Sequence, residues 1–475
     1  MGKRYPLYTT IKMQREKWFP HYKYISQAKN HHALLESGRG GQYTIMGLDP
    51  VAILKGKNNK LEIFCNNESQ IMDGNPLHLM REWMNDYKTE KDPTLPDFQG
   101  GAIGYISYDY ARYIESLPEI AKDDLYVPDV YFMVFNDVFI YDHKQEELYI
   151  ITHYTKGKLE SAKEHLHALE MLWKETKDVK DSNKGETIQE SDSDLQVSLT
   201  ELEFQSAVER IKEYIGQGDI FQVNLSVRQS QRLKVNPLEV YSCLREINPS
   251  PYMAFLQDPE FQIVSGSPEL LIKKSDAEVS TRPIAGTRSR GINEQEDERL
   301  AKELIENEKE RAEHVMLVDL ERNDLGRVCE YGSVEVNEFM VIERYSHVMH
   351  IVSNVRGTMS KQYDAYSVID AVFPGGTITG APKIRTMEII EELEPVRRGL
   401  YTGSIGWIGF NGDMELNIAI RTMTVHNGHA YIQAGAGVVI DSNPEAEYKE
   451  SLKKAKALWK AKEVAEETKL KEKVE

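Results

Sequence analysis

Residues 435–450 read GAGVVIDSNPEAEYKE. This stretch is informative about the fold, because it joins a predicted strand over residues 430–440 to a predicted helix over residues 441–459. Its alternating glycines allow backbone N–H groups to approach an anion closely. A tight structural turn is the commoner use of such a sequence, so the pattern alone does not define a site.

The predicted helix begins with a capping box formed by Ser442 and Glu445. Further along, Glu447, Glu450 and Lys454 recur at helical spacing and therefore share one face. This face presents two carboxylates beside an ammonium group.

A second acidic helix is predicted over residues 306–324, ENEKERAEHVMLVDLERND. Glu310 and Glu313 are three residues apart and share a face. The apolar stretch 315–320 indicates that this part of the helix turns inward. Carboxylates from two distant helices would suit Mg²⁺, which takes one or two of them and keeps water and substrate oxygens as its other ligands. The alternative is a solvated, charged helix.

Strands and helices do not alternate regularly along the rest of the chain. Apolar and β-branched runs occupy residues 44–54 and 127–141, and a strand is predicted over residues 416–425. Helices are predicted over residues 200–217 and 383–393. This order favours large mixed or antiparallel sheets with helices outside them over a doubly wound parallel sheet.

Composition divides the chain into four parts. Residues 1–176 form an N-terminal region, and residues 177–195 are polar enough to be a linker, with an ordinary surface loop as the alternative. Residues 196–460 are predicted to form the catalytic domain. Residues 461–475 are a charged tail that is expected to fray.

The acidic balance and the sparse cysteines restrict the class of protein. A net charge of −18 argues against nucleic acid or an anionic membrane as the main partner. The chain has 3 cysteines, without a zinc-ligand spacing, and no apolar run of membrane-spanning length. A cytoplasmic location is therefore expected. No cysteine lies in a nucleophile context, so the chain has no evident glutaminase of its own.

Several motifs, in this order, resemble the chorismate-utilising enzymes. That family includes the catalytic subunits of aminodeoxychorismate synthase and anthranilate synthase and, more distantly, isochorismate and salicylate synthases. The resemblance implies an α+β fold in which two large, mostly antiparallel sheets pack face to face with helices outside. The motifs are RPIAGTRSRG (282–291), ERAEHVMLVDLERNDLGRV (310–328), YSHVMHIVSNVRG (345–357), GGTITGAPKIRTMEII (375–390), YTGSIG (401–406), LNIAIRTM (416–423) and GAGVVIDSNPEAEYKE (435–450).

The resemblance also implies the roles of individual residues. Glu313 and Glu450 match magnesium ligands, with Glu310 and Glu447 as the acids beside them. Glu269 matches the general acid that protonates the departing C4 hydroxyl of chorismate. The remaining catalytic and substrate-binding positions are Gln222, His350, Thr377, Gly286, Thr287, Tyr401, Arg421, Gly435, Ala436, Gly437 and Lys454.

Two positions bear on the nucleophile and the product. Gln222 stands where water-using relatives have a lysine base, so ammonia is expected, supplied by a glutamine amidotransferase partner. Ala285 stands where many aminodeoxychorismate synthases have a lysine nucleophile and where anthranilate synthases have alanine, so this residue alone favours anthranilate synthase. The rest of the chain favours aminodeoxychorismate synthase, on the route to para-aminobenzoate and folate. Anthranilate synthase remains the alternative, and a non-catalytic regulator that binds chorismate or tryptophan is a second one.

Two further segments resemble the tryptophan pocket of anthranilate synthases. The alternative is a packed seam between domains. The residues concerned are Leu35, Ser37, Asn248, Pro251, Tyr252 and Met253.

Overall fold

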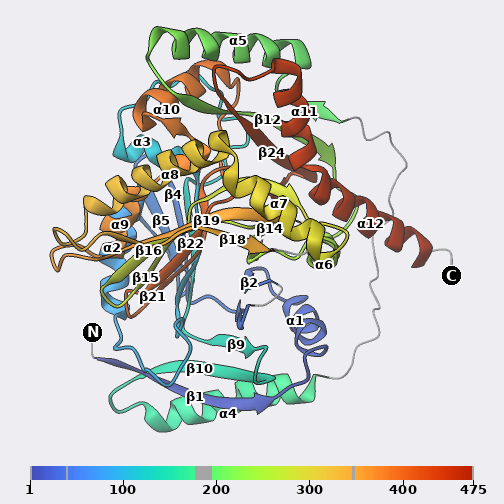
Figure 1. Ribbon diagram of the computed structural model, residues 1–475. Coiled ribbons are helices and arrows are strands. Elements are labelled where there is room, and N and C mark those ends of the chain that lie inside the picture. Colours follow the sequence, from blue (N-terminus) through green and yellow to red (C-terminus); the bar gives the residue numbers. More distant parts are fainter. Residues whose placement is uncertain (1–2, 39–40, 177–194, 345–347, 473–475) are drawn as a thin grey trace.

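The computed structural model describes residues 3–38, 41–176, 195–344 and 348–472. The segment predicted as a linker lies outside the described residues up to position 194. Within the described residues the chain forms two twelve-stranded sheets with helices around them (Figure 1). Neighbouring strands are antiparallel, so the α+β class with two large antiparallel sheets is confirmed.

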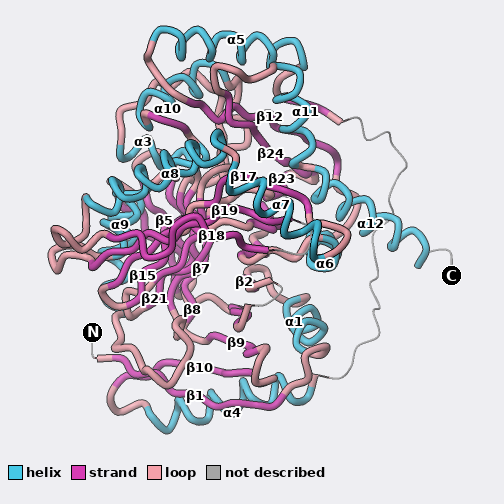
Figure 2. Tube along the Cα trace, in the orientation of Figure 1, coloured by secondary structure: helices cyan, strands magenta, loops and turns pink. Residues whose placement is uncertain are grey.

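The first sheet extends from β1 and β10 at the bottom of Figure 2 to β12 and β24 at the top. Its strands, in spatial order, are β1 (Arg4–Lys12), β10 (Glu147–Thr155), β9 (Val138–Asp142), β3 (Tyr43–Gly47), β2 (His32–Glu36), β13 (Tyr252–Gln257), β14 (Phe261–Ser267), β23 (Thr422–His426), β24 (His429–Val438), β12 (Gln222–Arg232) and β11 (Gln196–Val197), with β20 (Gly380–Ala381) paired to β12.

The second sheet runs through the centre of the molecule. Its strands, in spatial order, are β17 (Ile284–Ser289), β19 (Val348–Thr358), β16 (Glu278–Thr281), β15 (Leu270–Ser275), β22 (Met414–Asn417), β21 (Ser404–Gly409), β7 (Gly101–Ile106), β8 (Val130–Phe135), β4 (Ala52–Lys57), β5 (Lys60–Cys65) and β6 (Glu68–Asp73), with β18 (Glu335–Arg344) paired to β19.

A buried core joins the facing sides of the two sheets. Tyr105 and Met133 of the second sheet share one apolar cluster with Leu256 and Ile263 of the first, and all four side chains are fully buried. Both sheets take strands from either side of the segment 177–194, so the N-terminal and C-terminal parts of the chain share their sheets.

Helices cover the outer faces. α2 and α9 pack on the second sheet, α4, α6 and α12 on the first, and α5, α10 and α11 over β12 and β24 (Figure 1). The helices are α1 (Trp18–Ser26), α2 (Pro76–Met84), α3 (Ala111–Ile114), α4 (Leu159–Glu175), α5 (Glu201–Gln217), α6 (Pro237–Ile247), α7 (Glu294–Glu306), α8 (Glu308–Gly326), α9 (Ala365–Val372), α10 (Lys383–Leu393), α11 (Pro444–Lys454) and α12 (Lys456–Glu472), with a short 3₁₀ turn, η3, at Gly376–Ile378.

Three apolar runs cross from one sheet to the other. Residues 44–54 divide into β3 and β4, residues 127–141 into β8 and β9, and the single strand predicted over residues 416–425 is wrong because it divides into β22 and β23. The crossing between β22 and β23 carries little polar signal because it is buried: Ile418 and Ala419 are almost inaccessible. The other two crossings contain Asp49-Pro50 and Asn136-Asp137.

The helix ends agree with the sequence pattern at some places and differ at others. The helices predicted over residues 200–217 and 383–393 are confirmed as α5 and α10. The capping box of Ser442 and Glu445 is wrong: Asn443 caps α11 by accepting from Ala446 N at 3.0 Å, and Ser442 Oγ instead accepts from Val439 N.

The tail does not fray as expected, because α12 continues to Glu472. Ala461 and Ala465 are buried against the core that lies between α12 and α6. Small side chains at helical spacing form this contact, and the many charges around them obscured it in the sequence. No helix in the part of the chain that the structure describes is both long enough and apolar enough to span a membrane.

Candidate functional site

The first side of the candidate site is the start of β12, where Gln222 lies between two neighbouring strands. Gln222 pairs with Ala381 of β20, and the next residue pairs with Val438 of β24. The Gln222 side chain lies over Gly437, where a Cβ atom would come within 2.5 Å of Nε2. Gln222 Nε2 donates to Glu313 Oε1 of α8 at 3.3 Å. Through Gln222, Glu313 is therefore linked to the glycine segment of β24, residues Gly435–Gly437.

The second side is α11, which approaches the same segment of β24. Lys454 Nζ donates to the carbonyl oxygen of Gly435 at 2.9 Å and lies 3.0 Å from Glu450 Oε1. Burial raises the pKa of the neighbouring Glu447, and the charge of Glu450 raises it further. The two acids expected to hold magnesium therefore come from two helices that converge on Gly435–Gly437, with Ala436 buried between the glycines.

This donor set fits magnesium better than a metal that needs a closed protein cage. Among the described residues, no group of three or more His, Cys, Asp or Glu side chains is assembled for a metal ion. Mg²⁺ requires only one or two carboxylates and takes its other oxygens from water and substrate. The half-exposed Glu450 and the partly buried Glu313 leave room for such ligands.

Glu269 lies at the crossing between β14 and β15, beside the crossing between β22 and β23. Ile418 N donates to the Glu269 carbonyl oxygen at 2.9 Å, and Gly266 N donates to the Arg421 carbonyl oxygen at 3.0 Å. Arg421 has a left-handed backbone with φ of 50°, an uncommon conformation for a non-glycine residue. These bonds hold the acid and the guanidinium group side by side between the sheets.

Glu269 is only 7% exposed, and burial raises the pKa of its carboxyl group to about 7. The hydroxyl of Thr377 and the positive charges of Arg421 and Lys454 lower the pKa in part. Glu269 Oε1 and Thr377 Oγ1 are both buried without a well-aligned hydrogen bond among the described residues. Buried polar atoms of this kind are normally satisfied, so Glu269 Oε1 and Thr377 Oγ1 are available to bind a polar group of a substrate.

A third wall comes from β17 and β19. His350 lies opposite Thr287, and its Nδ1 is 3.0 Å from Thr287 Oγ1 and 3.1 Å from the Gly286 carbonyl oxygen. Because a carbonyl only accepts, Nδ1 carries the proton in the neutral ring. Burial lowers the pKa of His350, which keeps the ring neutral.

Gly286 also brings Glu310 to this wall. It lies at a β-bulge with φ of +62°, and a Cβ atom there would be 2.9 Å from Glu310 Oε2. Glu310 Oε1 accepts from Arg288 Nη1 at 3.1 Å. Glu310 and Glu313 therefore have different partners, although both lie on α8.

Thr377 and Tyr401 close the buried end. Thr377 belongs to η3, which touches α8 so closely that a Cβ atom on Gly376 would lie 1.9 Å from Leu320 Cδ2. Tyr401 is 8% exposed, and Arg398 lies 5.4 Å from the centre of its ring. The structure thus gathers the predicted catalytic and substrate residues around β24, η3 and the two crossings.

The residues predicted for a tryptophan pocket lie elsewhere, between the two sheets. A cavity of about 170 Å³ is lined by Leu35, Ser37, Pro251, Tyr252 and Met253, together with aromatic and charged side chains of both sheets. Asn248 is not part of this lining, because it lies at the C-terminal end of α6.

Two buried features next to the site are not evident in the sequence. Glu321 of α8 is buried, and both burial and the nearby Asp324 raise its pKa to about 8. Arg398 and Glu394 form a fully buried ion pair just before Tyr401. Glu321 resembles its charged neighbours in the helix, and the Arg398–Glu394 pair spans Pro395, so neither has a local sequence signal.

The chain is similar to known proteins over most of its length. A family model described as chorismate binding enzyme matches residues 30–460. Aminodeoxychorismate synthase component 1 of Bacillus subtilis (strain 168) is 56% identical over 98% of this chain and 99% of its own length. Anthranilate synthase component 1 of Acetivibrio thermocellus is 43% identical over 91% and 90%. The crystal structure of anthranilate synthase component I from Streptococcus pneumoniae TIGR4 matches with a TM-score of 0.78 and 36% identity, over 89% of this chain and 93% of that chain.

Proposed function

The chain belongs to the chorismate-binding enzyme family, and from this premise we propose that it is the catalytic component of an aminodeoxychorismate synthase. It converts chorismate and ammonia to 4-amino-4-deoxychorismate. The observation that carries the proposal is Gln222, whose amide donates to Glu313 at the substrate side of β12. An amide is not a base at neutral pH and does not activate water, whereas ammonia is already a nucleophile.

Glu269 is the general acid in this reaction. Its raised pKa of about 7 keeps a large part of the carboxyl group protonated near neutral pH. It donates its proton to the C4 oxygen of chorismate as the C–O bond breaks, so that water leaves. Ammonia forms the new C–N bond and then gives up a proton, which restores the charge balance.

The charges around Glu269 are arranged to hold an anionic substrate. Arg421 and Lys454 bring positive charge to a protein whose net charge is −18. In the proposal, Arg421, Tyr401 and the backbone of Gly435–Gly437 hold one carboxylate of chorismate. Buried donors of this kind position a ligand without having to reorganise. Gly286, Thr287, His350 and Thr377 form the remaining wall.

Magnesium and the ammonia donor complete the proposal. Glu313 and Glu450 would hold Mg²⁺, with Glu310 and Glu447 beside them, and the ion would supply positive charge for the ring carboxylate of the substrate. The ammonia comes from a glutamine amidotransferase component, in keeping with the name component 1 of the relatives. A cytoplasmic location stays a prediction.

Anthranilate synthase is the second candidate, and Ala285 is the observation that favours it. Ala285 is buried in β17 beside Gly286, where many aminodeoxychorismate synthases have a nucleophilic lysine. Without that lysine, ammonia or water has to be the nucleophile. The higher identity to aminodeoxychorismate synthase component 1, 56% against 43%, favours the first candidate. A non-catalytic regulator is disfavoured because Glu269, Glu313 and Glu450 are all present.

Turnover by the purified chain tests the proposal. Chorismate is expected to disappear when both Mg²⁺ and an ammonium salt are supplied, and to remain when either is left out. Glutamine in place of ammonium is expected to support no reaction without the partner. If chorismate persists under all conditions, the proposed enzyme function is wrong.

The metal ligands are tested by Glu313→Gln and Glu450→Gln. Each variant keeps the shape of the side chain and removes one carboxylate charge, so Mg²⁺-dependent turnover is expected to fall by at least about a hundredfold. Glu308→Gln is the matched control, because Glu308 is an exposed acid in the first turn of α8. Wild-type turnover in either ligand variant would remove the metal assignment.

A further inference from the structure

Arg398 lies beneath the candidate site, on the segment that follows α10. Its side chain is 1% exposed and forms five hydrogen bonds. Two of them join it to Glu394, with Nε 3.0 Å from Oε2 and Nη2 2.7 Å from Oε1. This fork uses the planar geometry of a guanidinium group, which lysine does not have.

The other three hydrogen bonds of Arg398 reach segments that carry predicted site residues. Nη1 donates to the carbonyl oxygen of Ile378 at 2.9 Å, next to Thr377. Nη1 also donates to Thr402 Oγ1 at 3.3 Å, next to Tyr401.

The third of these hydrogen bonds joins Arg398 to β12. Nη2 donates to the carbonyl oxygen of Asn224 at 2.6 Å, two residues after Gln222. One buried side chain therefore connects three walls of the site.

Glu394 extends the connection to a fourth wall. Its Oε1 accepts from Ser226 N at 2.9 Å and from Ser226 Oγ at 2.8 Å. Gln433 Nε2 in turn donates to Ser226 Oγ at 2.8 Å. Gln433 belongs to β24 and precedes Gly435 by two residues. The ion pair thus also reaches the strand that carries the glycine segment.

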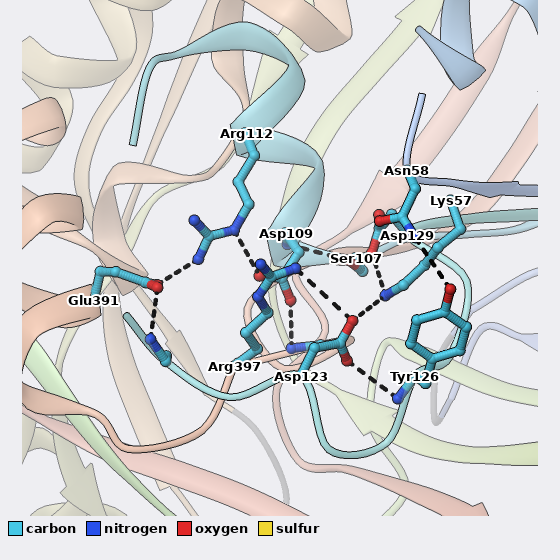
Figure 3. Close-up of polar contacts among 12 residues, drawn as sticks. Lys57, Asn58, Ser107, Asp109, Arg112, Asp123, Tyr126, Asp129, Glu391 and Arg397 are labelled. Atoms are coloured by element: carbon cyan, nitrogen blue, oxygen red, sulfur yellow. Dashed lines mark hydrogen bonds and ion pairs between the residues drawn. The ribbon is translucent and has the colours of Figure 1, made fainter. Parts of the chain in front are cut away.

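The segment is fixed from its other side as well. Figure 3 shows Arg397 pointing into a separate charged cluster, where its Nη1 lies 3.8 Å from Asp123 Oδ2. Gly399 N donates to Asp109 Oδ2 at 2.9 Å in the same cluster. Arg397 and Gly399 therefore contact residues outside the predicted site, and a lysine at position 397 keeps the positive charge that faces Asp123.

Stability alone does not account for this pair. A buried ion pair is often no more stabilising than apolar residues of the same volume. Arg398 instead donates directed hydrogen bonds to η3, β12 and Thr402, and each of these bonds ends within two residues of a predicted site residue. The pair reaches β24 indirectly, because Ser226 binds Glu394 and accepts from Gln433.

We propose that Arg398, through its pairing with Glu394, is a positioning residue that sets the relative placement of η3, β12, β24 and Tyr401. The inference rests on the proposed function for its catalytic consequence. Arg398 itself does not touch the substrate. A site that depends on alignment loses on the order of a hundredfold in rate when a group is displaced by about 1 Å.

The first test compares Arg398→Lys with Arg397→Lys. The Arg398 variant keeps the charge but loses the fork, so kcat for chorismate with ammonium is expected to fall by about a hundredfold, with a smaller change in KM. The neighbouring control is expected to stay within about threefold of wild type. Equal activities in the two variants would overturn the inference.

Amide hydrogen exchange supplies a readout that does not depend on turnover. In Arg398→Lys, peptides covering residues 222–226, 376–379, 401–404 and 433–437 are expected to exchange together about tenfold faster than in wild type, while Arg397→Lys leaves them unchanged. Unchanged exchange in the four peptides, or acceleration spread evenly over the whole chain, would overturn the positioning role.

Misfolding of the variant and failure of the proposed function must each be distinguished from failure of the positioning role. If Arg398→Lys does not fold, Glu394→Gln removes the charge while keeping the side-chain shape, and the same two readouts apply to it. A wild-type chain without turnover would overturn the proposed function, and the exchange experiment would still decide the positioning role.

Discussion

Glu269 affects both the proposed reaction and the stability of the folded protein. Its pKa in the folded protein is about 7, above the ordinary value of 4.5, because it is buried. Folding therefore favours the protonated acid. The stability linked to this group is fully present below pH 4.5 and is lost as the pH rises through 7. The acid that the reaction requires thus destabilises the folded chain under alkaline conditions.

Glu269→Gln is expected to abolish turnover and to raise stability at pH 8. The amide removes the buried charge, and the difference of about 2.5 pKa units corresponds to a gain on the order of 3 kcal/mol. Most of the gain is expected to disappear by pH 5. Denaturant unfolding of both proteins at the two pH values measures it. A gain in stability of the same size at pH 5 and pH 8 would show that removal of the buried charge is not its cause.

Several site residues could be predicted, and others could not. Glu269, Glu313 and Gln222 match positions of a known family, so their proposed roles could be assigned from the sequence. Arg398 has no such signal, because the carbonyl groups of Ile378 and Asn224 that it binds are brought to it only by the tertiary fold. The left-handed conformation of Arg421 likewise arises from the crossing between sheets.

At the scale of elements, the glycine segment of β24 determines how closely Gln222 approaches. Gly437→Ala places a Cβ atom 2.5 Å from Gln222 Nε2, at the end of a flexible side chain that can move away. The contact between Gln222 and Glu313 is then lost. We expect kcat/KM to fall by about tenfold or more while stability changes by less than about 1 kcal/mol.

Gly435→Ala is the informative comparison for that experiment. Here the new Cβ atom would lie 2.5 Å from the carbonyl oxygen of Leu225, which belongs to the backbone of β12 and yields less easily. This variant is expected to lose about 2 kcal/mol or more of stability. If Gly437→Ala is as strongly destabilised as Gly435→Ala, the lower activity of Gly437→Ala is explained by disruption of the pairing between β12 and β24. Displacement of the Gln222 side chain is then not its cause.

The elements themselves were predictable where the pattern is local. α5 has a capping box at Thr200 and ends at Gly218 in the left-handed conformation, and both signals are visible in the sequence. The crossing between β22 and β23 was not predictable, because an apolar run buried between two sheets looks like one continuous strand. The helical tail α12 was missed because its buried alanines are few among many charges.

At the scale of the whole molecule, the two sheets interleave the N-terminal and C-terminal parts of the chain. β2 pairs with β13, and β7 pairs with β21, so each sheet is completed only by both parts. The class of fold was predictable from the family resemblance. Composition did not predict the interleaving. The polar segment 177–195 suggests a domain boundary, whereas both sheets contain strands from before and after it.

Separate expression of residues 1–176 and 195–475 tests this interleaving. Each fragment alone exposes unpaired strand edges and half of the core between the sheets, so neither is expected to fold cooperatively. Expressed together, they are expected to assemble into one complex with chorismate turnover. A fragment 1–176 that unfolds cooperatively by itself would show that it is an independent domain.

The identity of the product tests the account most directly. The purified chain is incubated with chorismate, Mg²⁺ and an ammonium salt, and the products are separated and identified by mass. The expected product is 4-amino-4-deoxychorismate, which keeps the enolpyruvyl side chain, so that no pyruvate is released. Anthranilate together with an equal amount of pyruvate would contradict it.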